Sequence, residues 1–447
     1  MKRILLSMAA VLFINMLPLN AQSFQHQVYS ENTVISSKQY VKGNIYQKDL
    51  LLFVDMLKTT HPMFAPGTSS TINIDSIGKQ GYLWAEKCNS ADELSYYLQS
   101  IASLLNDGHT LVSPDLDKNA IYPFSFFIEG GHVFLNVIDK NYESYLGKEI
   151  TKINNHPVKE VIESFRSQIS SDNDVYFKDK VNGYMQFFNL WKHNSYSIND
   201  KSLVLSFEDE KDIALYPVNK QNMNITFLQP SFQEGLVTIN NKQPFSFKIL
   251  EDESICYFQF NQCTDNSDIR YQLNMQNKEI TEAMEAKLAR IPRFDTVVAN
   301  MFKEMKEHRI KTLVVDVRNN GGGNSVLCDI LLSFLKPKEE TQTMPSQIRI
   351  SNLWKAQFPL LFSEFTEGLE KRNQKLEIGK LYNAIELSFG ESSQSPDNMN
   401  PLFEVNTDKE KIFKGKVVFI QSPKTFSSAG MLITMAVDNN IGKVIGS

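Results

Sequence analysis

Apolar residues along the first half of the chain recur with two different periods. Residues 46–57 and 92–105 carry apolar side chains at helical spacing, so both segments predict helices with one buried face. The shorter segments 120–128 and 132–138 are rich in aromatic and β-branched residues and predict strands. This half of the chain therefore predicts a helical region followed by a β-rich one.

Strands and helices alternate in the second half. Residues 255–260, 313–317 and 417–420 are apolar runs that predict buried strands, and a helix is expected at residues 296–308. Residues 428–437 have the apolar content and length of a buried helix. The strands at 313–317 and 417–420 run directly into loops of small residues, and these loops carry the candidate chemistry.

The loop after residues 417–420 places a serine where a strand gives way to a helix. Pro423 ends the strand, so Ser427 lies at the start of the following helix. A hydroxyl there benefits from the partial positive charge of the helix N-terminus, and the N–H of Ser428 points toward whatever Ser427 attacks. The alternative is that Ser427 or Ser428 serves only as the N-cap of the helix.

The loop after residues 313–317 contains three consecutive glycines. Glycine allows positive φ and close approach of a ligand, so Gly321, Gly322 and Gly323 are suited to direct an N–H at a developing negative charge. A phosphate cradle is a rival interpretation, but the loop has neither a GxGxxG register nor a GK[ST] ending. A plain strand-to-helix turn is the other alternative.

Taken together, DVRNNGGG and TFSSAG resemble the S41 family of serine peptidases, which includes the C-terminal processing peptidases and the tricorn core proteases. In that family the pattern D-[LV]-R-x-N-x-G-G supplies an oxyanion-hole glycine, which corresponds to Gly322. The family's nucleophile motif, S-A-S-E or S-A-A-E, places the nucleophile at Ser427. Gly430 departs from the pattern, because the family usually has an acid there.

A general base is also needed, because a serine hydroxyl is a poor nucleophile at neutral pH and imidazole has a suitable pKa. The segment NDGHT at residues 106–110 follows a predicted helix and resembles the surroundings of the base histidine in the tricorn-like branch, so His109 is the candidate. His61 also resembles a recurrent family position, but a histidine before proline at a helix end is more often structural.

The rival mechanism is a Ser-Lys dyad, as in the processing peptidases. Alignment with that branch places the lysine just beyond Ser447, and residues 442–447 resemble the opening of a core strand. We therefore expect the chain to be part of a longer protein, with a third catalytic residue beyond Ser447.

The resemblance implies an α/β fold in which a ClpP/crotonase-like ββα catalytic domain follows an N-terminal helical region and a PDZ-like β segment. The expected divisions are a signal peptide at 1–21, the helical region at 22–115, the PDZ-like segment at 116–165, a connecting β-rich region at 166–249 and the S41-type catalytic domain, incomplete at its C-terminus, at 250–447. Within the last, residues 357–401 are a long polar and aromatic insertion without clear periodicity, which predicts either a substrate wall or lid or an exposed, variable loop.

The PDZ-like segment is suggested by residues 147–158, GKEITKINNHPV, which resemble the G-D-x-I-x-x-I-N-G-x-P-V phrase of PDZ modules. Asn155 replaces the usual glycine and tolerates the left-handed conformation of the turn. A PDZ-like groove would bind an extended peptide as an added strand. An ordinary hairpin and helix is the alternative.

The N-terminus predicts export. Lys2 and Arg3 form a basic start, residues 4–17 an apolar core of signal-peptide length, and a passable cleavage site precedes Gln22. No later stretch is apolar enough to cross a bilayer, so we expect a periplasmic or extracellular protein without an integral membrane span after signal removal.

Charge and cysteine content narrow the function further. A formal net charge of -5, a pI near 5.9 and the lack of a basic run argue against nucleic acid as a partner. Cys88, Cys256, Cys263 and Cys328 lack metal-ligand spacing; a bridge between Cys256 and Cys263 is awkward across a strand, so buried thiols are expected. No cofactor or metal is implied, and oligomeric state is left open.

These inferences predict an exported serine endopeptidase that cleaves polypeptides. Ser427 attacks the scissile carbonyl, His109 acts as general base and acid, and the N–H groups of Gly322 and Ser428 hold the oxyanion. One alternative is a non-catalytic peptide- or ligand-binding protein on the same fold. The other is an esterase-type serine hydrolase, although the G-x-S-x-G elbow of that class is missing.

Overall fold

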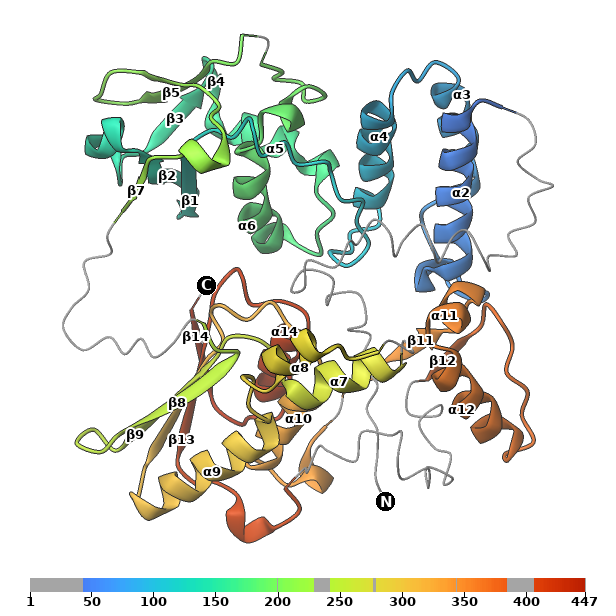
Figure 1. Cartoon of the computed structure of the whole chain (residues 1–447), viewed down its shortest axis with the longest axis vertical. Helices are drawn as coiled ribbons and strands as arrows, with labels where there is room; N and C mark the ends of the chain where they lie inside the picture. Colours follow the sequence, from blue (N-terminus) through green and yellow to red (C-terminus); the bar gives the residue numbers. More distant parts are fainter. Residues whose placement is uncertain are drawn as a thin grey trace. The chain divides into compact units, whose positions relative to one another are not determined.

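The computed structural model describes residues 43–198, 200–228, 242–275, 279–342, 344–383 and 406–446 (Figure 1). Contacts divide these residues into an N-terminal unit, within 38–55 and 70–235, and a C-terminal unit, within 56–69 and 236–447. The expected signal peptide at 1–21 and the start of the expected helical region lie outside the described residues. Within the described ranges, no helix is both long and apolar enough to cross a bilayer.

The described part of the N-terminal unit begins with helices, of which the first and the third correspond to the predicted segments 46–57 and 92–105. They are α2 (Ile45–Thr60, whose last turns belong to the C-terminal unit), α3 (Ile74–Ala85) and α4 (Ala91–Ser103). The side chain of Asn73 accepts a hydrogen bond from the N–H of Ser76, and Ser90 caps α4 through the N–H of Glu93. These polar caps fix where α3 and α4 start, because the first N–H groups of a helix have no partner within it.

Two antiparallel sheets follow in the same unit. One has the order β1-β2-β7, with β1 (Phe124–Glu129), β2 (His132–Asp139) and β7 (Ile225–Phe227). The other has the order β4-β3-β5-β6, with β3 (Ile150–Ile153), β4 (His156–Pro157), β5 (Leu203–Phe207) and β6 (Ile213–Leu215). The helices among them are α5 (Val158–Ser164) and α6 (Asp174–Met185).

The expected division at residue 165 does not match the packing of this unit. One hydrophobic core runs from Tyr122 to Leu215 and includes Phe165 and Trp191, whose rings meet edge to face at 4.9 Å. Strand β5 also pairs with β3. Residues expected to form a separate connecting region therefore complete the core and sheet of the preceding segment.

The PDZ-like phrase forms strand β3, a tight turn, strand β4 and helix α5. Asn154 and Asn155 have φ values of 48° and 66°, so the left-handed turn expected at Asn155 is confirmed. The side chain of Asn154 accepts a hydrogen bond from the N–H of Val204 at 2.7 Å, which ties the turn to β5. This hairpin and helix fit either interpretation, and a true PDZ domain stays a prediction.

The free edge of strand β1 is occupied by a side chain of helix α6. The N–H of Phe126 donates to Asn182 Oδ1 at 3.1 Å, and Asn182 Nδ2 donates to the hydroxyl of Ser125 at 2.9 Å. A peptide cannot add to this edge as a further strand unless Asn182 gives way.

The C-terminal unit is built on a five-stranded sheet of order β14-β13-β10-β9-β8 (Figure 1). Its strands are β8 (Phe245–Leu250), β9 (Ile255–Phe260), β10 (Thr312–Asp316), β13 (Lys416–Gln421) and β14 (Lys443–Gly446). Strands β9, β10, β13 and β14 run parallel to one another, and β8 is antiparallel to β9. Because β10 and β13 are adjacent and parallel, the loops that follow them emerge at the same edge.

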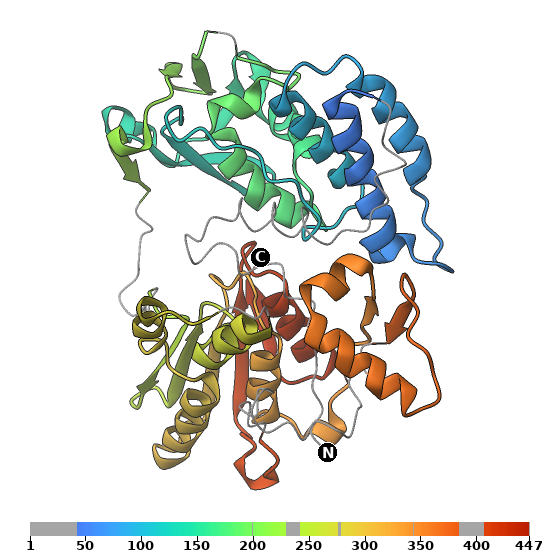
Figure 2. The ribbon, with the colours of Figure 1, turned by 45° about the vertical axis from the view of Figure 1, so that its right-hand side comes forward.

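Helices pack on this sheet and enclose the larger core (Figure 2). They are α9 (Phe294–Glu307), α10 (Val326–Ser333) and α14 (Ser428–Asp438), and α7 (Asn266–Met275) and α8 (Glu282–Leu288) precede them in the chain. Phe258, Leu313 and Phe419 of the central strands are completely buried, as expected for parallel strands covered on both faces. The mixed α/β class is confirmed here, and a ClpP/crotonase-like ββα repeat stays a prediction.

The insertion expected at residues 357–401 has regular secondary structure in its described part, although its sequence shows no clear periodicity. It contains α12 (Pro359–Glu370), which follows α11 (Asn352–Gln357), and β12 (Leu381–Asn383), which pairs with β11 (Gln347–Arg349). Phe365 and Leu369 of α12 are buried in a small core of their own. Residues 384–405 lie outside the described part of the chain.

The segment that contains β11, α11, α12 and β12 is attached to the end of helix α2. The buried guanidinium of Arg349 donates to the carbonyl oxygens of Lys58 at 2.9 Å and His61 at 2.7 Å. His61 Nδ1 accepts a hydrogen bond from the N–H of Met63 and caps the short helix that follows. The expected structural role of His61 is confirmed.

Candidate active site

Ser427 occupies a strained turn between strand β13 and helix α14. Its φ and ψ are 53° and -125°, a conformation that costs a residue other than glycine about 1–3 kcal/mol. The turn is tied to the end of strand β10: Phe426 N–H donates to the carbonyl oxygen of Asn320, and the Thr425 hydroxyl donates to that of Val317. Such bonds hold the strained backbone in place and project Ser427 from the start of the helix.

Ser428 differs from Ser427 in being almost completely buried. Its hydroxyl donates to the carbonyl oxygen of Gly323 at 2.6 Å, so it links helix α14 to the glycine loop. Its N–H is in the first turn of α14, where backbone donors have no acceptor within the helix. The structure therefore gives the Ser428 side chain a structural task and leaves its N–H at the helix N-terminus, near Ser427.

The glycine loop lies directly against this turn. Gly322 has a φ of +102°, and a Cβ added there would lie 2.6 Å from Ser427 Cβ and 2.9 Å from the carbonyl oxygen of Phe426. Gly323 has a φ of +136°, and a Cβ there would lie 2.1 Å from the carbonyl oxygen of Cys263. Neither position can hold a side chain, which is the physical reason for consecutive glycines.

The N–H of Gly322, predicted to be an oxyanion donor, has a partner in this structure. It donates to Asn320 Oδ1 at 2.9 Å, and Asn320 is fully buried and donates through Nδ2 to the carbonyl oxygen of Phe260. Gly322 is therefore correctly placed beside Ser427, but its N–H faces an amide oxygen of the protein. Its role in an oxyanion hole stays a prediction.

The aspartate and arginine of the DVR segment fix the start of the loop. Arg318 donates to both carboxylate oxygens of Asp316, at 2.9 Å from Nε and 2.6 Å from Nη2, and the hydroxyl of Tyr257 donates to Asp316 as well. Burial opposes ionisation of Asp316, but the hydrogen bonds from Arg318 and Tyr257 outweigh it and lower the pKa of this carboxyl group. A charged Asp316 thus anchors the loop to the sheet.

A second buried carboxylate, Asp268 on helix α7, holds the other end of the loop. Asn324 Nδ2 donates to Asp268 Oδ1 at 2.6 Å, and Asn324 directly follows the three glycines. Burial raises the pKa of Asp268 to about 7, and the neighbouring Asp265 carboxylate adds to the effect. The sequence did not reveal this residue, because an isolated aspartate in a helix does not indicate a hydrogen bond to a residue 56 positions later.

His109 lies in a short loop of the N-terminal unit. Asp107 Oδ1 accepts the N–H of His109 at 2.9 Å and lies 3.6 Å from His109 Nδ1, while Asp107 Oδ2 accepts the hydroxyl of Thr110. The Ser170 hydroxyl donates a hydrogen bond to the carbonyl oxygen of Asp107 at 3.0 Å, which holds the loop in place. The half-exposed imidazole is therefore held beside a carboxylate, and its pairing with Ser427 stays a prediction.

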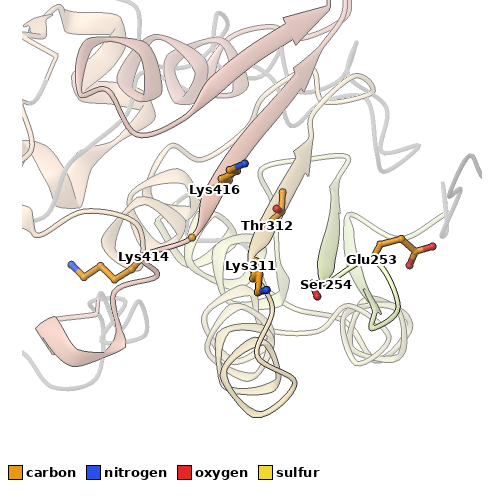
Figure 3. Close-up of a pocket in the computed structure, with 7 residues that line it drawn as sticks. Glu253, Ser254, Lys311, Thr312, Lys414 and Lys416 are labelled. Atoms are coloured by element: carbon orange, nitrogen blue, oxygen red, sulfur yellow. The ribbon is translucent and has the colours of Figure 1, made fainter.

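A pocket of about 490 Å³ lies at the other end of the strands (Figure 3). It is lined by Glu253, Ser254, Lys311, Thr312, Lys414, Gly415 and Lys416, where strands β9, β10 and β13 begin. Ser427 follows the opposite end of β13, so this pocket is separate from the candidate active site. Across the described ranges, no group of three or more His, Cys, Asp or Glu residues is placed to hold a metal ion.

Comparison with known proteins gives one family match and several similar structures. The sequence model of peptidase family S41 matches residues 287–447, which include the glycine loop and Ser427. Mature CPAF complexed with lactacystin is 12% identical, with a TM-score of 0.55 over 90% of this chain and 84% of that one. A second structure of mature CPAF gives 12% identity and a TM-score of 0.53, over 90% and 83% of the two chains. The photosystem II D1 C-terminal processing protease is 11% identical, with a TM-score of 0.37 over 90% and 81%.

No curated protein matches the chain. The CPAF structures share the fold of this chain, and the family match over residues 287–447 indicates the class of protein. Residues 287–447 match peptidase family S41, and this match supports a serine peptidase.

Replacement of Gly322 by alanine should disrupt the contact between the two loops. The new Cβ would overlap the Ser427 turn, so we expect Gly322→Ala to lower stability by about 1–3 kcal/mol in urea denaturation. Gly321→Ala is the matched control, because a Cβ there meets nothing within 4 Å and Gly321 has no positive φ. Equal stability of the two variants would contradict the proposed contact.

The strain at Ser427 can be measured with two variants that both lack the hydroxyl. Glycine adopts a φ of 53° without cost whereas alanine does not, so Ser427→Gly should be more stable than Ser427→Ala by about 1 kcal/mol. Thermal unfolding of both variants provides the comparison. An alanine variant as stable as the glycine variant would show that the turn is relaxed.

The raised pKa of Asp268 predicts a pH dependence of stability. The folded protein keeps the Asp268 proton up to about pH 7, whereas the unfolded chain releases it near the ordinary value of 3.8. The stabilisation is complete below that lower value and is lost as pH rises toward 7. Asparagine cannot ionise, so the melting temperature of Asp268→Asn relative to wild type should increase from pH 5 to pH 8. A constant difference would contradict the assignment.

Proposed function

We propose that this chain is an exported serine endopeptidase that cleaves polypeptides through an acyl-enzyme formed on Ser427. The observation that carries the proposal is the strained turn of Ser427 at the start of α14, packed against Gly322. A serine held in this conformation beside a glycine loop is costly for a structural N-cap, and the cost is explained if the hydroxyl must be presented to a substrate.

In the proposed reaction His109 removes the proton of the Ser427 hydroxyl as the oxygen attacks the scissile carbonyl carbon. The imidazolium then gives that proton to the leaving amine, and an acyl-enzyme remains on Ser427. Water attacks the ester in the second half, again with His109 as base, and releases the acid product. Asp107 Oδ1 lies 3.6 Å from His109 Nδ1, beside the ring that carries the proton in each half of the proposed reaction.

The oxyanion of each tetrahedral intermediate needs N–H donors. The N–H of Ser428 is one, supported by the partial positive charge of the α14 N-terminus. The N–H of Gly322 is the second if the Asn320 amide releases it when substrate binds. Each donor of this kind contributes about 3 kcal/mol to transition-state stabilisation in serine proteases.

Export is proposed from the sequence alone. Lys2 and Arg3 followed by the apolar residues 4–17 have the order of a secretory signal, so the mature enzyme would act in the periplasm or outside the cell. Its substrates would then be exported or extracellular polypeptides.

The proposal is tested by a fluorophosphonate probe, which reacts with activated serines. We expect the full-length wild type to be labelled, Ser427→Ala to lose labelling, and His109→Ala to react about 10²–10⁴-fold more slowly. His156→Ala is the matched control for a histidine of the same unit, because His156 is exposed and remote in sequence from the loop, and it should react as wild type.

Each contrary result points to a different correction. Labelling that persists in Ser427→Ala would contradict the assignment of Ser427 as the nucleophile. Labelling at the wild-type rate in His109→Ala would contradict the assignment of His109 as the general base. An unlabelled wild type would favour the non-catalytic binding protein. Hydrolysis of simple esters without hydrolysis of peptides would favour the esterase.

A further inference from the structure

Two cysteines lie in sulfur contact beneath the candidate active site. Cys263 follows strand β9, Cys328 is on helix α10, and their Sγ atoms are 3.7 Å apart. Both are buried, and all four cysteines of the chain are free. They are 65 positions apart, so their spacing gave no indication of the pair.

Cys263 is bonded to the glycine loop through its main chain and its side chain. Its N–H donates to the carbonyl oxygen of Gly322 at 3.0 Å, and its carbonyl oxygen accepts the N–H of Asn324 at 2.7 Å. Its Sγ lies 3.6 Å from Asn320 Oδ1, the atom that also accepts the N–H of Gly322. A change at this sulfur therefore reaches the loop that contacts Ser427.

Cys328 makes the corresponding contact with the other loop. Its thiol donates to the carbonyl oxygen of Ser428 at 3.4 Å, in the first turn of helix α14. The two thiols thus connect the two loops of the candidate site: Cys263 contacts the glycine loop, and Cys328 contacts the first turn of helix α14 after Ser427.

We propose that Cys263 and Cys328 are a redox modification site, which a disulfide oxidant converts to a disulfide that slows acylation of Ser427. The two thiols together lose two protons and two electrons, an S–S bond forms between them, and the oxidant disulfide is reduced to two thiols. The S–S bond is about 2.05 Å long, so the sulfurs must move closer together and both S–H donors disappear. Because the main chain of Cys263 is hydrogen-bonded to Gly322 and Asn324, a movement of Cys263 also moves the glycine loop.

The native pair is expected to react slowly. The contact with Cys263 and burial raise the pKa of the Cys328 thiol, and attack on a disulfide requires a thiolate with access to it. Oxidation should therefore be efficient when the full-length chain folds in the presence of the oxidant, before the core closes over both sulfurs.

The test compares full-length protein refolded in a glutathione redox buffer with protein refolded in a phosphine reductant. After denaturation and alkylation with iodoacetamide, the oxidised protein should carry two fewer adducts than the reduced protein. A non-reducing peptide map should join Cys263 to Cys328. An equal number of adducts in the two samples, or a bridge between other cysteines, would overturn the proposal.

The effect on the site rests on the proposed function and is read separately. Labelling of oxidised wild type by the fluorophosphonate probe should be about tenfold slower than that of the reduced protein, and reduction should restore it. Cys256→Ala, which removes a buried thiol outside the pair, should respond as wild type, whereas Cys328→Ala or Cys328→Ser should not respond. A disulfide that leaves the labelling rate unchanged would overturn the coupling. If reduced wild type is not labelled at all, the proposed function fails, and the alkylation count still decides whether the disulfide forms.

Discussion

The close approach of Gly322 to the Ser427 turn is the constraint on which the candidate site depends. Only a residue without a Cβ fits there, since a Cβ would lie 2.6 Å from Ser427 Cβ. The approach in turn requires β10 and β13 to be adjacent and parallel, so that both loops leave the sheet at one edge. The strained φ of Ser427 is tolerated because bonds from Phe426 and Thr425 to the end of β10 hold the turn.

Buried polar groups keep the glycine loop in this position. Asp316 is bonded by Arg318 at the start of the loop, and Asp268 accepts a hydrogen bond from Asn324 at its end. Asn320 lies between them and takes the N–H of Gly322. Because the last bond occupies a donor that acyl transfer would use, the Asn320 amide is the group whose movement would convert the observed loop into a complete oxyanion hole.

Features set by a few neighbouring residues could be predicted from the sequence. The strands leading into DVRNNGGG and TFSSAG, the helix after Ser427 and the left-handed Asn155 are of this kind, because periodicity and small residues determine them locally. Helix α12 was missed although Pro359 at its first turn is a recognisable start signal. The boundary predicted at residue 165 does not match the packing, because β5 pairs with β3 across about fifty residues and no local sequence pattern indicates that pairing.

The polar and sulfur contacts beneath the loop could not have been predicted for the same reason. Asp268 with Asn324 and Cys263 with Cys328 are pairs brought together only by tertiary packing, and neither has a spacing that indicates chemistry. Ser428 follows Ser427 directly in the sequence, but its buried hydroxyl and its bond to Gly323 follow only from the fold.

The central claim is that Ser427, and not its neighbour, is the acylated residue. The most direct measurement is tandem mass spectrometry of the peptide that contains residues 425–435, after reaction of the full-length protein with a fluorophosphonate. This account predicts a single adduct on the Ser427 hydroxyl. An adduct on Ser428, whose hydroxyl is bonded to Gly323 in this structure, or on a serine outside this turn, would contradict it.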